Sequence, residues 1–117
     1  MFDIGKNFRI SRKISVSGIY GNVKRGKNSM IGPYVLISDG NHILKEKDIQ
    51  IANQGGNFNQ AIIEENVWVG CQSQVLMGVH LGSNSIVVAN TTVVKSMDGG
   101  SLIVGTPAEI KKNIFLR

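Results

Sequence analysis

Two histidines and one cysteine carry most of the chemistry available to this chain of 117 residues. His42 closes the polar segment Asp39-Gly40-Asn41-His42, and an imidazole can accept and return a proton near neutral pH. Asp39 is placed to orient that imidazole, although Asp-Gly is equally a turn signal. Cys71 is the only cysteine and His80 the only other histidine. We therefore expect neither an internal disulfide nor a closed metal site.

A six-residue repeat in residues 63–93 must position these side chains. Aliphatic residues stand at every sixth position, and a small or β-branched residue follows each of the first five by four positions. The aliphatic series is Ile63, Val69, Val75, Leu81, Val87 and Val93, and the second series is Val67, Ser73, Val79, Ser85 and Thr91. Such a short unit with turn-forming residues predicts one strand and one turn per hexad. Stacked hexads predict an all-β parallel β-helix, whose handedness the periodicity does not set.

The repeat continues upstream in a looser form. Ile31 and Ile37 extend the aliphatic series, whereas Arg25 interrupts it. Three earlier members are displaced by three residues, which indicates a short insertion near Ser17 and Gly18; they are Ile4, Ile10 and Val16. The N-terminal part is therefore predicted to form further coils of the same β-helix.

Two segments fall outside the repeat. Residues 38–60 form a polar, Gly- and Asn-rich insertion, which predicts a long functional or disordered loop. After a turn at 98–100, the tail 109–117 is predicted to form a short helix with Ile110, Ile114 and Phe115 on one face. We expect a single domain over residues 1–117, with the loop insertion at about 38–60 and the C-terminal tail at about 99–117.

Charge and hydropathy exclude several classes of function. The net charge is 13 − 8 = +5, but residues 1–27 hold seven basic side chains against Asp3 alone, so the rest of the chain carries −1. This basic N-terminal segment suits an anionic ligand or a solvated surface. It lacks the interleaving of basic and aromatic residues that is typical of a nucleic-acid interface. No apolar run reaches the roughly 18–20 residues of a membrane span, and no secretory core follows Met1, so we expect a cytoplasmic protein.

The hexads, the segment 66–70 (NVWVG) and the ending 104–108 (VGTPA) resemble the bacterial hexapeptide-repeat acyltransferases over nearly the whole chain. That resemblance implies a left-handed parallel β-helix with three hexads per coil, in homotrimers with interfacial active sites. The segment 38–42 is similar to the catalytic loop of the xenobiotic and sugar O-acetyltransferase branch. The implied reaction is direct acetyl transfer from acetyl-CoA to a sugar hydroxyl, in surface-polysaccharide synthesis and without a metal.

The resemblance also implies roles for single residues. His42 is the general base, and Asp39 binds the acceptor or orients the imidazole. Trp68 flanks the coenzyme A channel, small residues let the pantetheine arm approach the backbone, and lysines meet the phosphates. The cofactor-binding set is Trp68, Gly70, Cys71, Ala89, Lys95, Thr106, Pro107 and Lys111, with Lys112 beside it. Cys71 is not expected to carry the acyl group, and Glu109 departs from the Lys or Arg that is common in the family.

Other functions stay open from the sequence. N-acetylation of a nucleotide-linked amino sugar fits the basic N-terminal third, and a purely structural trimeric β-helix fits the hexads. His42 within the broken repeat argues against the structural alternative. A lyase of the trimeric carbonic-anhydrase kind needs three zinc-binding histidines, whereas this chain has two. His80 lies between two inward positions, so it is predicted to point outward.

Overall fold

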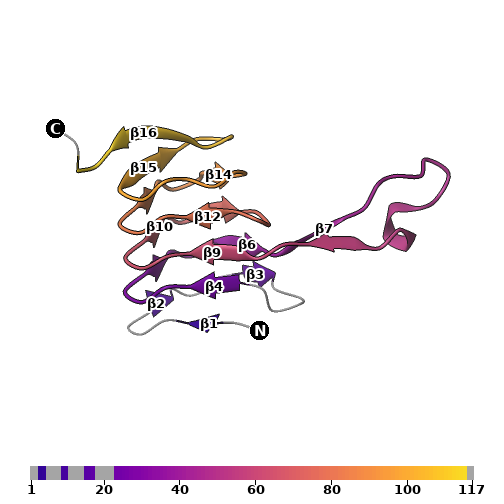
Figure 1. The fold of residues 1–117 in the computed structure, drawn as a ribbon, viewed down its shortest axis with the longest axis horizontal. Coiled ribbons are helices and arrows are strands. Elements are labelled where there is room, and N and C mark those ends of the chain that lie inside the picture. Colours follow the sequence, from indigo (N-terminus) through magenta and orange to yellow (C-terminus); the bar gives the residue numbers. More distant parts are fainter. Residues whose placement is uncertain (1–2, 5–8, 11–14, 18–22, 116–117) are drawn as a thin grey trace.

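The computed structural model is a stack of β-helical coils with one long arm (Figure 1). It describes residues 3–4, 9–10, 15–17 and 23–115, with side chains from residue 23 onward. The coils rise from the N-terminal strand β1 to the C-terminal strand β16, and the arm leaves the stack near its middle (Figure 1). The all-β parallel β-helix predicted from the hexads is confirmed.

Three sheets form the sides of the stack. The first contains β1 (Asp3–Ile4), β4 (Val23–Arg25), β9 (Ala61–Ile63) and β12 (His80–Leu81). The second contains β2 (Arg9–Ile10), β5 (Met30–Ile31), β10 (Trp68–Val69), β13 (Ile86–Val87), β15 (Ser101–Val104) and β16 (Glu109–Asn113). The third contains β3 (Ser15–Ser17), β6 (Leu36–Ser38), β11 (Gln74–Val75) and β14 (Thr92–Val93). The chain visits the three sheets in turn, so each coil of three hexads returns to the first sheet.

The strand register confirms the coil length and both insertions. Ile63 pairs with Leu81, an offset of 81 − 63 = 18 residues, which is three hexads. Ile10 pairs with Ile31, an offset of 31 − 10 = 21, so the N-terminal coil carries the three extra residues predicted near Ser17 and Gly18, a position that the described residues only partly cover. Arg25 pairs with Ile63, and its offset of 38 contains the inserted arm.

Both predicted series of inward residues are buried. The aliphatic series is at most 1% exposed from Ile63 to Val93, and the small series includes the buried hydroxyl residues Ser73, Ser85 and Thr91. These hydroxyls bond to the backbone of the next coil; Ser73 Oγ, for example, donates to Val88 O at 3.0 Å. The core is therefore a set of columns that run along the stack. Arg25 occupies an aliphatic position at 3% exposure, and burial lowers the pKa of its guanidinium.

The inserted segment is an ordered hairpin rather than the predicted loop. β7 (Gly40–His42) pairs antiparallel with β8 (Gly56–Phe58), and a 3-10 turn η1 (Ile51–Asn53) lies between them. At the base, Asn59 N donates to Asp39 O at 2.9 Å. This hairpin arm, residues 39–59, leaves the stack between β6 and β9 (Figure 1). Residues 40–42 and 56–58 therefore form a short antiparallel ladder, and residues 43–55 connect its two strands.

The predicted C-terminal helix is wrong. Residues 109–113 form β16, which pairs antiparallel with β15, Val104 facing Glu109 and Ser101 facing Asn113. A turn at 105–108 reverses the chain, so the tail meets the unpaired edge of β15 at the end of the stack. Covering that edge satisfies its backbone groups, which outweighs the helical spacing of Ile110, Ile114 and Phe115. In the described part of the chain, no helix has the length and apolar content needed to cross a membrane.

Candidate active site

His42 stands on the hairpin arm with its side chain exposed. Its backbone is held on both sides, because His42 pairs with Gly56 across the hairpin and His42 N donates to Asn41 Oδ1 at 3.0 Å. The exposed imidazole is therefore displayed on a paired strand of the arm. A histidine placed in this way can exchange protons with a molecule that docks against the arm.

Asp39 lies three residues away in a different environment. It occupies the bend between β6 and β7 and is 1% exposed, whereas His42 is exposed farther along the arm. The sequence placed the two residues in one segment but did not indicate this difference in burial. Asp39 therefore lies buried at the root of the arm, where its carbonyl oxygen accepts the hydrogen bond from Asn59 N.

Four of the residues predicted to bind coenzyme A gather along one edge of the stack, where β10, β13 and β15 lead out of the second sheet. Gly70, Cys71, Ala89 and Thr106 come from three successive coils, and we call them the corner strip. Gly70 N donates to Val87 O at 2.8 Å, Asn90 N to Cys71 O at 2.9 Å, and Thr106 Oγ1 to Asn90 O at 3.5 Å.

The corner strip has small side chains, of which those of Ala89 and Thr106 are exposed, whereas Gly70 is buried. A Cβ on Gly70 would lie 2.7 Å from Ala89 N and 3.0 Å from Ala89 Cα, so glycine is required by the close approach of the two coils. Trp68 precedes the strip on β10 and is 49% exposed, as predicted. Trp68, Ala89 and Thr106 therefore form an exposed surface with one large aromatic ring beside two small side chains, which suits a long, narrow ligand.

The remaining predicted contacts are spread more widely. Pro107 follows Thr106 at the end of the strip and is exposed. Lys111 lies on β16 at the end of the stack, whereas Lys95 follows β14 on the same edge as the hairpin arm. All three side chains are exposed, and only Pro107 adjoins the corner strip along the chain. In the described part of the chain, no three His, Cys, Asp or Glu side chains gather in a way that could hold a metal ion.

Comparison with known proteins agrees with this architecture. A family model described as a hexapeptide repeat of succinyl-transferase matches residues 60–95. A galactoside O-acetyltransferase of Lactococcus lactis is 34% identical over 90 residues, which cover 76% of this chain and 42% of that protein. A maltose O-acetyltransferase from Clostridium difficile superposes with a TM-score of 0.84 and 26% identity, covering 97% of this chain and 59% of that one.

The chain belongs to the hexapeptide-repeat acyltransferase family. Its β-helix is accordingly the left-handed one that the family resemblance implied. A galactoside acetyltransferase solved in complex with coenzyme A shares the fold at a TM-score of 0.79 and 24% identity, covering 97% of this chain and 55% of that one. This family member spans about half the length of the relatives that it matches.

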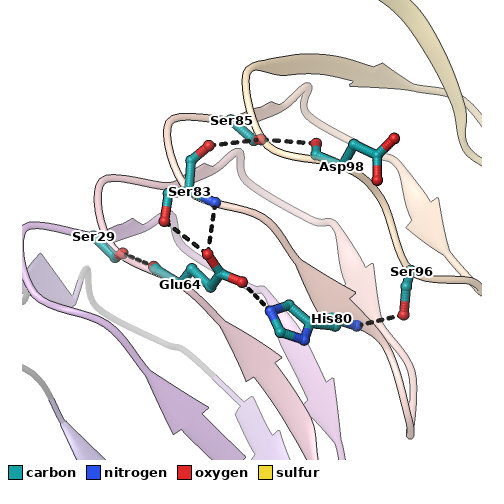
Figure 2. Close-up of polar contacts among 7 residues, drawn as sticks. All are labelled: Ser29, Glu64, His80, Ser83, Ser85, Ser96 and Asp98. Carbon is teal, nitrogen blue, oxygen red and sulfur yellow. Dashed lines mark hydrogen bonds and ion pairs between the residues drawn. The ribbon is translucent and has the colours of Figure 1, made fainter.

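The structure contains one polar cluster that the sequence patterns did not predict (Figure 2). Glu64 follows β9, and its carboxylate contacts the imidazole of His80 on β12. Its other oxygen accepts hydrogen bonds from Ser83 Oγ at 2.8 Å and from Ser83 N at 3.3 Å. The 18-residue coil length could have predicted this contact. Residues 18 positions apart stack on each other, so Glu64 stacks on Gly82, which is next to Ser83.

The cluster is open to solvent and ties two coils together. The Glu64 and His80 side chains are 40% and 47% exposed, and grooves of about 790 and 710 Å³ flank them. The hydrogen bond with His80, followed by those from Ser83, lowers the pKa of the Glu64 carboxyl. His80 also donates its backbone N–H to Ser96 Oγ at 2.9 Å, which extends the link to a third coil. His80 points outward, as predicted, and its contacts are within the stack.

Proposed function

We propose that this protein transfers an acetyl group from acetyl-CoA to a hydroxyl of a sugar. Two observations support the proposal: an exposed histidine lies on a paired strand of the hairpin arm, and the chain shares sequence with a galactoside O-acetyltransferase and its fold with a maltose O-acetyltransferase. The display of His42 carries the proposal, because a purely structural β-helix has no need of an imidazole on an arm that leaves the stack. The expected setting is surface-polysaccharide synthesis in the cytoplasm.

In the proposed reaction, His42 acts as general base. The imidazole takes the proton of the sugar hydroxyl while the hydroxyl oxygen attacks the thioester carbonyl of acetyl-CoA. It then returns the proton to the departing thiolate, so coenzyme A leaves as a thiol and the sugar as an ester. Cys71 has no covalent role in this scheme. Its place in the corner strip makes it a neighbour of the pantetheine arm instead.

The corner strip is the proposed site for the pantetheine arm. Ala89 is exposed and carries only a methyl group, so a narrow chain can lie close to the backbone there, and the exposed ring of Trp68 borders the path. Gly70 lies beneath Ala89 and lets the two coils approach closely. Thr106 and Pro107 lie at its end. Lys95, Lys111 and Lys112 are candidates for the coenzyme phosphates, as charges on flexible stems.

The site requires more than one copy of the chain. The hairpin arm leaves the stack at the edge between β6 and β9, whereas the corner strip follows β10 at a different edge. In the proposed assembly His42 of one chain serves the corner strip of a neighbour, and such a heterologous contact forms a ring when its rotation closes after three subunits. Exposed apolar side chains, among them Met30, Trp68 and Val94, suit burial between subunits. We propose a homotrimer with shared sites.

The test combines binding, turnover and assembly. Wild type is expected to bind coenzyme A by calorimetry, to elute as a trimer by light scattering, and to acetylate at least one sugar in a broad panel. His42→Ala should keep the binding and the trimer but lose roughly 10²–10⁴ in turnover, the range for a positioned acid–base group. His80→Ala is the matched control and should keep most of its turnover. Full turnover by His42→Ala, or a wild type that neither binds coenzyme A nor acetylates any acceptor, would contradict the proposal.

A further inference from the structure

The hairpin arm presents an aromatic ring on the same face as His42. Antiparallel pairing sets Gly40 opposite Phe58 and His42 opposite Gly56, so these four residues share one face of the ladder. Phe58 is 43% exposed and His42 is exposed as well. The ring and the imidazole are thus diagonal neighbours on a solvent-facing surface, within the reach that such pairs have on a sheet.

Two glycines give the ring its position. A Cβ on Gly40 would lie 2.6 and 2.8 Å from Phe58 Cδ1 and Cε1, and a Cβ on Gly56 would lie 2.7 Å from Phe58 Cζ. The ring therefore fills the space of both missing side chains and extends along the strand toward the residue opposite His42. Because neither glycine can carry a side chain without moving the ring, this face of the arm holds only the ring and the imidazole at these four positions.

We propose that Phe58 is the platform on which the acceptor sugar stacks while His42 takes its proton. This inference rests on the proposed function and names its acceptor as a pyranose. A pyranose has a face of C–H groups that packs on the negative face of an aromatic ring, and hydroxyls at its rim. A ring stacked on Phe58 carries a rim hydroxyl toward the neighbouring imidazole. Phe58 would thereby select cyclic sugars over acyclic alcohols.

The experiment compares two acceptors of similar polarity, methyl β-D-galactopyranoside and the open-chain polyol galactitol. Phe58→Leu keeps an apolar side chain over the two glycines but removes the aromatic face. It should raise KM for the pyranoside by about three- to tenfold, the range expected for one aromatic contact, with kcat and the Kd of coenzyme A nearly unchanged. Phe58→Tyr should behave like wild type. Ile51→Ala, which removes an exposed apolar side chain elsewhere on the arm, is the matched control and should leave both KM values unchanged.

A second readout needs no turnover. With ring-labelled phenylalanine, titration with the pyranoside should shift the Phe58 resonances of wild type, and galactitol should shift them much less. Phe58→Leu with a wild-type KM for the pyranoside would overturn the inference, and so would an equal loss for both acceptors, which would indicate a distorted arm. Either result leaves the proposed function standing if wild type transfers acetyl groups. A wild type that acetylates no sugar and shows no Phe58 shift would remove both proposals.

Discussion

The link between Glu64 and His80 allows a stability prediction with an internal control (Figure 2). Glu64→Gln keeps the shape of the side chain but removes its charge. The ion pair with His80 is about half exposed, so solvent screening limits its contribution to roughly 0.2–1 kcal/mol. The hydrogen bonds from Ser83 persist in weaker form, since charge-assisted bonds are about twice as strong as neutral ones. We expect a loss of about 1 kcal/mol in the free energy of unfolding at neutral pH.

Glu65→Gln is the matched control. Glu65 is adjacent in sequence and pairs with Lys27 at 3.5 Å, with both side chains more than half exposed. A single exposed pair of this kind contributes about 0–0.5 kcal/mol. Urea unfolding of the three proteins at one subunit concentration measures the difference, because the stability of an oligomer depends on concentration.

The pH dependence separates the charge from the shape of the side chain. The pKa of Glu64 is lowered in the folded state, so its stabilising contribution is complete above the unfolded pKa and is lost as the pH falls through the folded pKa. Wild type and Glu64→Gln should therefore converge in stability below the ordinary glutamate pKa of about 4.3. The reasoning would be refuted if Glu64→Gln and Glu65→Gln lost the same free energy of unfolding. It would also be refuted if Glu64→Gln stayed less stable than wild type in acid.

Two further predictions concern the corner strip and the core. Ala89→Phe should weaken coenzyme A binding by at least about tenfold in calorimetry, since a large ring beside Gly70 blocks a narrow channel; unchanged affinity would place the channel elsewhere. Leu81→Ala should lower the free energy of unfolding by about 2–5 kcal/mol, because Leu81 is fully buried in a column between Ile63 and Met97. Gln74 points outward, so Gln74→Ala should change the free energy of unfolding by less than about 0.5 kcal/mol. Similar losses for Leu81→Ala and Gln74→Ala would contradict the assignment of Leu81 to a buried column.

The sequence by itself determined the coils. A hexad has one inward residue per strand and one per turn, and a solenoid contacts only its nearest coils, so a local pattern is enough to specify the core. The columns from Ile63 to Val93, the three-residue shift near the N-terminus and the outward position of Trp68 were all predictable for this reason. The interruption at 38–60 likewise indicated where His42 departs from the repeat.

The tertiary structure decided where the repeat stops. The C-terminal tail has helical spacing, but an unpaired strand edge lies within its reach, and pairing with that edge made it β16. Within the arm, the antiparallel register set Phe58 beside His42, and no periodicity in 38–60 specifies that register. Glu64 contacts His80 because the 18-residue coil stacks Glu64 on Gly82, which places it between His80 and Ser83 of the next coil. Each of these contacts depends on which segments become neighbours in space, which local sequence patterns do not encode.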